Sequence, residues 1–122
     1  MPFEVHTVRS HNRLRVRVWG HPTPEEACAL TSEAIDALSR LRAGFDVLVD
    51  VSGLGSLPDG CMPQVERLQS YFVKNQVGRV VRVCGTLPDV VLKLERQARA
   101  AGYAAHLATS VAEAEALLDC PP

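Results

Sequence analysis

The feature that most constrains this chain is a regular alternation of strand-like and helix-like segments separated by turn residues. Beyond the first two extended segments, stretches whose apolar residues recur every three or four positions alternate with short Val-rich runs. This alternation is typical of βαβ units, in which parallel strands share one sheet and right-handed crossovers connect them. A chain of 122 residues has room for one hydrophobic core. We therefore expect one α/β domain that covers residues 1–122.

Two extended segments at the start predict a β-hairpin. Residues 3–8 form the first and residues 13–19 the second, and the polar residues 10–12 between them are typical of a turn. The second segment alternates strictly, which is the period of a strand with one buried and one solvated face. Two sets of side chains are expected on opposite faces: Leu14, Val16 and Val18 toward the core, and Arg13, Arg15 and Arg17 toward solvent.

Capping signals mark the helices that follow. Residues 23–26 (Thr-Pro-Glu-Glu) and 110–113 (Ser-Val-Ala-Glu) both fit a capping box, which satisfies N–H groups at a helix start. Glycine is expected to end the first three helices, at Gly44, Gly78 and Gly102. The order is β-β-α-β-α-β-α-β-α, a mixed sheet with about four helices. The strands after the hairpin are expected near residues 45–51, 79–84 and 103–107, and the segment 52–60 is too rich in Gly and Pro for a helix or strand.

Composition argues against several classes of partner. The net charge of −1 gives no general attraction to nucleic acid or to an anionic membrane, and aromatic residues make up only 5% of the chain. The N-terminus lacks the apolar run of a signal peptide, and no stretch is long and apolar enough to span a membrane. We therefore expect a cytoplasmic protein that binds neither nucleic acid nor membrane.

The four cysteines are widely spaced and contain no Cys-x-x-Cys pair. We expect reduced thiols and no metal site. Cys28 and Cys84 lie in apolar patterns that indicate small core residues. Cys61 follows the glycine-rich segment, where a helix N-terminus would lower its pKa.

Few residues suggest catalysis. Gly53-Leu54-Gly55 is a fragment of a dinucleotide-binding pattern, but the residues after it delay the next helix. No histidine lies in a recognisable nucleophile motif. The arginines of residues 13–17 are open to two interpretations, a patch for an anion or an acidic partner, or a solubilising face that discourages edge pairing.

Several strings, taken in order, resemble the STAS domain of bacterial anti-sigma-factor antagonists and SpoIIAA-like proteins. Asp46-Val47-Leu48-Val49-Asp50-Val51-Ser52-Gly53 resembles the family's central strand, and residues 79–85 (Arg-Val-Val-Arg-Val-Cys-Gly) resemble its next strand. Residues 102–114 resemble its closing strand and helix, with Ser110 to Ala114 as the helix start. The resemblance covers most of the chain and implies a STAS-like fold with a regulatory, protein-binding function.

In phosphoregulated members of that family, an Asp precedes a Ser or Thr that is phosphorylated at the start of the second helix. One register places Asp59 on the Asp and Gly60 on the acceptor, and the other uses Asp50 and Val51. Neither register supplies a hydroxyl, and the first is preferred because glycines and Pro58 forbid a helix that begins at Ser52.

The sequence thus predicts a non-catalytic bacterial protein-interaction domain that lacks the phosphorylation switch and needs no cofactor. Its partner-binding loop is expected to contain Ser52, Gly53, Ser56, Asp59 and Gly60. The partner is a protein of unknown identity, and homodimerisation stays open. One alternative is a carrier of a small apolar ligand, as in related SpoIIAA-like and lipid-binding folds. A small enzyme that uses Cys61 or a histidine is less favoured.

Overall fold

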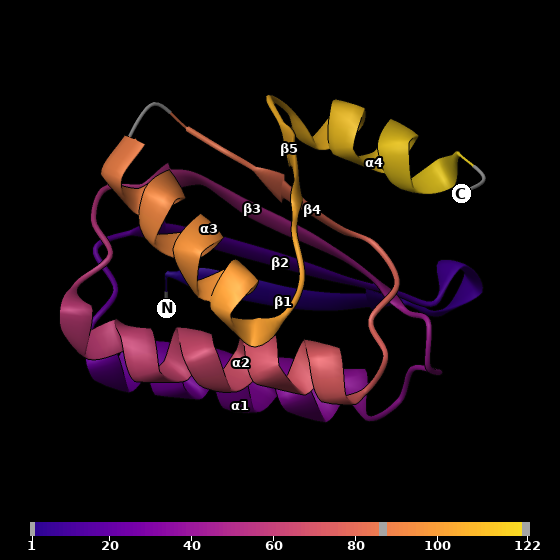
Figure 1. Cartoon of the computed structure of the whole chain (residues 1–122), viewed down its shortest axis with the longest axis horizontal. Helices are drawn as coiled ribbons and strands as arrows, with labels where there is room; N and C mark the ends of the chain where they lie inside the picture. Colours follow the sequence, from indigo (N-terminus) through magenta and orange to yellow (C-terminus); the bar gives the residue numbers. More distant parts are fainter. Residues whose placement is uncertain (1, 86–87, 121–122) are drawn as a thin grey trace.

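The computed structural model describes residues 2–85 and 88–120 (Figure 1). Its centre is a five-stranded sheet in the order β1-β2-β3-β4-β5. β1 and β2 are antiparallel, and each later strand is parallel to the one before it. The strands are β1 (Phe3–Val8), β2 (Arg13–Gly20), β3 (Asp46–Leu54), β4 (Val80–Val83) and β5 (His106–Ala108). The helices are α1 (Pro24–Leu38), α2 (Met62–Lys74), α3 (Pro88–Ala101) and α4 (Val111–Asp119), with 3-10 turns at Arg9–His11 and Asp59–Cys61.

The expected α/β order with an N-terminal hairpin is confirmed. Leu14, Val16 and Val18 are buried in the main core, as the alternation in β2 predicted. Thr23 caps α1 with a complete capping box, in which its hydroxyl accepts from the Glu26 N–H and the Glu26 carboxylate accepts from the Thr23 N–H.

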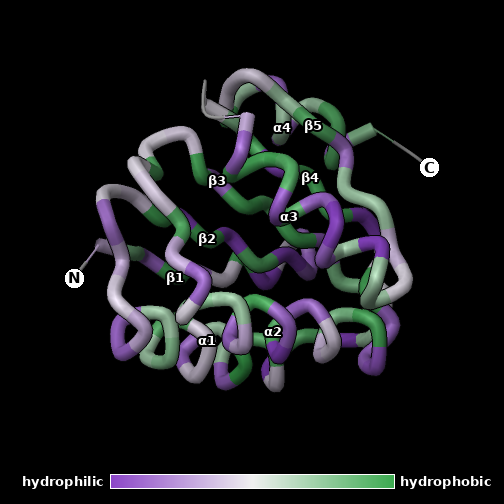
Figure 2. The backbone as a smooth tube through the Cα atoms, turned by 60° about the vertical axis from the view of Figure 1, so that its left-hand side comes forward, coloured by the Kyte–Doolittle hydropathy of each residue, from purple (hydrophilic) through white to green (hydrophobic). Residues whose placement is uncertain are grey.

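Helices cover both faces of the sheet, but unequally (Figure 1). α1, α2 and α3 pack on one face, where residues such as Leu14, Val47 and Phe72 form the larger core. α4 alone packs on the other face, where Leu118 joins a smaller core around Leu48. In Figure 2, β3 and β4 are coloured mostly as hydrophobic, whereas the helices alternate in colour along their length. This difference fits central strands that are covered on both faces and helices that bury one stripe.

Two glycines serve the packing of loops and do not end helices. α1 ends at Leu38 and α2 at Lys74, before Gly44 and Gly78. Gly44 adopts a φ of 84°, and a Cβ on Gly78 would lie 2.6 Å from the Gly44 carbonyl oxygen. The two loops therefore approach too closely for a side chain at Gly78, so this glycine serves loop packing and the expected helix ends at Gly44 and Gly78 were wrong.

β3 is longer than expected, so the segment that begins at Ser52 is not all loop. The strand continues to Leu54, and Gly53 pairs with Trp19 of β2 beside a register shift. A Cβ on Gly53 would lie 2.9 Å from the Trp19 Cβ. Glycine here permits the two strands to approach closely, which the composition of the segment did not reveal.

The C-terminal elements differ in detail from the expectation. β5 begins at His106 and not at residue 103. Ser110 caps α4 by accepting from the Glu113 N–H, but the Glu113 carboxylate accepts from the N–H and hydroxyl of Thr109. These hydrogen bonds lower the pKa of Glu113. The helix start was therefore predicted correctly, although the second half of the capping box is displaced by one residue.

Candidate functional site

The carboxyl ends of β2, β3 and β4 meet at one edge of the sheet, because these strands are parallel. In open α/β sheets, ligands bind preferentially outside the carboxyl ends of the strands. The surface at this edge, called here the carboxyl-edge surface, contains all five residues expected to bind a partner and two further side chains. Its residues are Ser52, Gly53, Ser56, Asp59, Gly60, His21 and Lys93.

An ion pair ties this surface to α3. The Lys93 ammonium donates to the Asp59 carboxylate at 2.7 Å and to the Leu57 carbonyl oxygen at 2.9 Å. The hydrogen bond and the positive charge of Lys93 lower the pKa of Asp59. The 3-10 turn at Asp59–Cys61 has no side-chain cap, so Asp59 binds Lys93 and does not cap the helix.

Both serine hydroxyls of the carboxyl-edge surface already have hydrogen-bond partners. The Ser56 Oγ lies 2.9 Å from the His21 Nδ1, and the Ser52 hydroxyl donates to the Asp50 carboxylate at 2.6 Å. Within residues 2–85 and 88–120, no carboxylate hydrogen-bonds to His21. The Ser56–His21 pair therefore lacks the orienting acid of a catalytic triad.

A shallow groove of about 300 Å³ runs between the loop after β3 and the start of α3. Its walls come from Ser56, Leu57 and Pro58 on the loop side and from Asp89, Val90 and Lys93 on α3. The groove thus borders the ion pair between Asp59 and Lys93.

The two candidate acceptor positions lie in different environments. Gly60 is exposed in the turn directly before α2. Val51 lies inside β3 and is 6% exposed. Only Gly60 therefore lies on the surface at a helix start.

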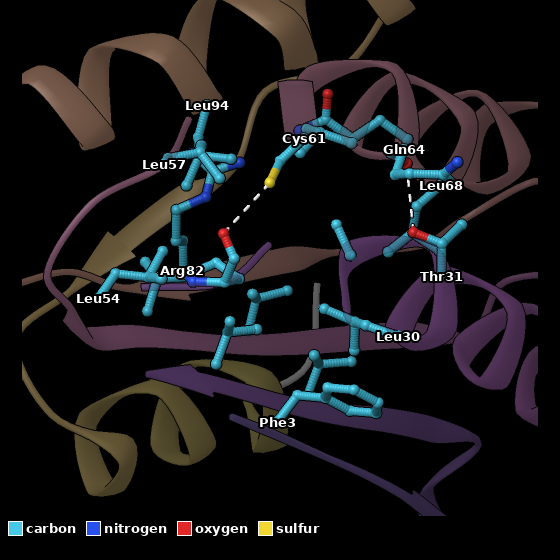
Figure 3. Close-up of a pocket in the computed structure, with 18 of the residues that line it drawn as sticks. Phe3, Leu30, Thr31, Leu54, Leu57, Cys61, Gln64, Leu68, Arg82 and Leu94 are labelled. Atoms are coloured by element: carbon cyan, nitrogen blue, oxygen red, sulfur yellow. Dashed lines mark hydrogen bonds between the residues drawn. The ribbon is translucent and has the colours of Figure 1, made fainter. Parts of the chain in front are cut away.

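A second candidate site is a cavity of about 100 Å³ between the sheet and helices α1, α2 and α3. Most of its lining is apolar. In Figure 3, Phe3 of β1 lies on one side of the cavity, and Cys61 and Gln64 lie on the opposite side. The apolar lining includes Val16, Leu30, Leu54, Leu57, Leu68 and Leu94.

Polar and charged side chains also line the cavity: Glu26, Thr31, Gln64, Gln69, Arg82 and Tyr103. Arg82 is 2% exposed and forms an ion pair with the Glu95 carboxylate of α3. Gln69 of α2 is 4% exposed, and its Oε1 has no hydrogen-bond partner. Burial raises the pKa of Tyr103 to about 12, an effect that the Arg82 charge and hydrogen bonding from Gln69 and Arg82 partly offset. The Tyr103 hydroxyl is therefore close to both Gln69 and Arg82.

Cys61 is a buried thiol. It is 1% exposed, its S–H donates to the Pro22 carbonyl oxygen at 3.6 Å, and burial raises its pKa, as do the charges of Glu25 and Glu26. Burial and the neighbouring carboxylates therefore outweigh any lowering of this pKa by the start of α2. No histidine is among the described residues that line the cavity. The arrangement does not provide the activated thiolate that nucleophilic catalysis needs.

The burial of the other cysteines also differs from the expectation. Cys28 is exposed and Cys84 is half-buried, although both were predicted to be small core residues. Cys28 follows Ala27, which takes the buried position on α1. All four cysteines are free thiols.

The three arginines of β2 do not form one exposed patch. They share one face, but α4 packs on part of it, and Arg13 is 5% exposed with its guanidinium 2.9 Å from the Asp119 carboxylate. Arg15 pairs with Glu115 of α4 at 3.3 Å, and Arg17 stacks over the Trp19 ring. The prediction that Arg13 faces solvent is wrong, because the sequence did not reveal that α4 covers this part of the sheet.

Residues 2–85 and 88–120 contain no cluster of three or more His, Cys, Asp or Glu side chains suited to a metal ion. Within the same residues, no helix is both long and apolar enough to cross a membrane.

No protein-family model matches the sequence, and no curated protein matches it significantly.

The polar residues missed at the sequence level include Lys93, Gln69, Arg82 and Tyr103. Arg82 gave a usable signal, because a charged residue within a run of valines at a central strand must find a partner. Lys93 and Gln69 gave none, because charged and amide side chains are ordinary on helices.

Proposed function

We propose that this chain is a STAS-like protein-interaction domain that binds a protein partner through the carboxyl-edge surface and has no phosphorylation switch. The observation that carries the proposal is the position of Gly60. It is exposed in the turn before α2, next to Asp59, where phosphoregulated STAS domains have their Ser or Thr. Glycine there adds no charge to the surface and lets a partner approach the backbone.

Neighbouring hydroxyls are poor substitutes for the missing acceptor. Ser52 donates to the Asp50 carboxylate, so a phosphoryl group there would meet a like charge. Ser56 is paired with His21. Partner binding is therefore expected to be constitutive with respect to phosphorylation at this surface.

The test introduces one negative charge at Gly60. A Cβ at this position would lie 3.1 Å from the Pro24 Cγ, so any side chain disturbs the local packing. Gly60→Asn is therefore the matched control, because it adds the same bulk without the charge. With a partner isolated on the wild-type protein, Gly60→Asp should weaken binding by roughly tenfold or more relative to Gly60→Asn, measured by calorimetry.

A second variant examines the same surface from the other side of the ion pair. Asp59→Ala removes the carboxylate that Lys93 binds, and it should also lower the affinity for the partner. Circular dichroism and urea unfolding would confirm that the variants remain folded. If Gly60→Asp and Asp59→Ala both bind the partner as the wild type does, the carboxyl-edge surface is not the interface.

A second candidate function is the binding of a small apolar ligand, which the cavity favours. The cavity lies between the sheet and three helices, and its lining is mainly aliphatic. An engineered apolar cavity of about 150 Å³ in another protein binds benzene, so a volume near 100 Å³ suits a ligand of similar or smaller size. Titration with toluene, followed by NMR chemical shifts of the lining residues, tests this function. The absence of any shift up to the solubility limit of toluene would exclude it.

A further inference from the structure

One buried polar atom in the cavity has no partner. Gln69 is 4% exposed, lines the cavity, and its Oε1 accepts no hydrogen bond. Folding removes this amide oxygen from water without replacing the lost hydrogen bond, which is unfavourable. A ligand or a water that donates to Gln69 would restore the lost interaction.

The two charged side chains that line the cavity, Arg82 and Glu26, already have partners, and the Glu26 carboxylate accepts from the Thr23 N–H at the start of α1. The positive charge of Arg82 is balanced by Glu95, with which it forms an ion pair. The hydroxyl of Tyr103 stays protonated at neutral pH, because burial raises its pKa to about 12. An anionic ligand would have to compete with Glu95 for Arg82 and would lose its own hydration. These conditions favour a neutral ligand.

Gln69 and Arg82 line the same cavity, and both influence the Tyr103 hydroxyl, which also lines it. A guanidinium has five N–H donors and an amide oxygen is an acceptor. A hydroxyl group is the simplest group that both donates and accepts, so it complements this pair of side chains.

We propose that the cavity binds a small neutral molecule with an apolar body and one hydroxyl group, which donates its proton to Gln69 Oε1. The apolar body contacts the aliphatic lining, and its size is about that of a six-membered ring. This inference rests on the second candidate function, the binding of a small apolar ligand, and adds the polar group by which the ligand is selected.

The experiment compares three ring compounds of similar shape in NMR titrations of the full chain: toluene, phenol and benzoate. Phenol is expected to bind at least as tightly as toluene, although its hydroxyl must leave water. Benzoate is expected to bind at least tenfold more weakly than phenol, because the carboxylate is charged. Chemical shifts of the lining residues identify the cavity as the place of binding.

Gln69→Met removes the acceptor and nearly preserves the volume of the side chain. In this variant, the affinity for phenol should fall by about tenfold and that for toluene should stay within about a factor of three. Gln97→Met, on α3 and outside the cavity lining, is the matched control and should change neither affinity.

The outcomes separate this inference from the function on which it rests. If none of the three compounds shifts the lining residues, both are wrong. If toluene binds and phenol binds much more weakly, or if Gln69→Met leaves phenol affinity unchanged, only the hydroxyl-specific inference is wrong, and Gln69 is then satisfied by water. If benzoate binds most tightly, the inference of a neutral ligand is wrong.

Discussion

At the residue scale, burial has its clearest electrostatic effect on Tyr103. Its ring packs edge-on against Phe72 at a centroid distance of 6.1 Å, and its hydroxyl lies beside Gln69 and Arg82. Burial raises the pKa of Tyr103 to about 12, above its ordinary value of 10.0, because the phenolate would be poorly solvated. This shift makes the stability of the protein depend on pH.

Tyr103→Phe is expected to reduce the loss of stability at alkaline pH. Below pH 10, the hydroxyl is protonated in both the folded and the unfolded chain, so the shift has no effect. Between about pH 10 and 12, the unfolded chain loses the proton that the folded chain keeps. The free energy of unfolding of the wild type should therefore fall with pH in that range, by roughly 2 kcal/mol in total.

Urea unfolding between pH 9 and 12 would measure this effect. The difference between the wild-type and Tyr103→Phe curves isolates the contribution of this hydroxyl from that of other groups that titrate in the same range. Parallel curves would show that Tyr103 ionises equally in both states and that its site is more polar than the contacts indicate.

The polar residues of the cavity could not be predicted from the sequence, because their neighbours come from distant segments. Gln69 lies on α2, Arg82 on β4 and Tyr103 in the loop after α3. A local pattern carries no information about which helix crosses which strand. The position of Asp59 and Gly60 directly before α2 could be predicted, because turn chemistry is encoded by neighbouring residues.

At the scale of elements, β2 shows where periodicity succeeds and where it does not. The strict alternation correctly placed Leu14, Val16 and Val18 in the core. It also placed the arginines on one face, but it could not show that α4 covers the end of that face near Arg13. Similarly, the apolar stripes located the helices, but α1 and α2 end before Gly44 and Gly78, which lie in closely packed loops.

Arg13 is expected to anchor α4 to the sheet. Its side chain is 6% exposed and its guanidinium bonds to Asp119 near the end of α4. Arg13→Ala removes this hydrogen bond and the packing of the aliphatic stem, so it should reduce the free energy of unfolding by about 1–3 kcal/mol. Arg17→Ala, on the same strand, should cost only about 0.5 kcal/mol, because Arg17 is exposed and has only its contact with the Trp19 ring.

Urea unfolding of the two variants would measure the difference. Hydrogen exchange would add a local test, since the amides of α4 should lose protection in Arg13→Ala before those of β3 and β4 do. Equal, small effects of both substitutions would contradict an anchoring role and would indicate that α4 is held by its apolar residues alone.

At the scale of the whole molecule, the two candidate sites lie on either side of the same loop. Leu57 lines both the apolar cavity and the groove of the carboxyl-edge surface, and its carbonyl oxygen accepts from Lys93. A side chain at this position therefore contacts any molecule in the cavity and also supports the surface proposed to bind a partner. The thin, one-helix layer on the far face of the sheet contains neither site.

The four thiols report on the packing of the whole molecule. Cys28 and Cys120 are exposed and should react with Ellman's reagent within seconds to minutes at pH 8. Cys84 is half-buried with a pKa raised by burial, so it should react more slowly. Cys61 is 1% exposed and should react only when the core opens. The rate at which Cys61 is labelled should rise with urea in parallel with unfolding, and Cys61→Ala should remove this slowest phase.

Unfolding without reductant should make all four thiols reactive, as expected for a reduced protein. If Cys61 is labelled at the same rate as Cys28, the Cys61 thiol is open to solvent and α2 packs loosely on the sheet.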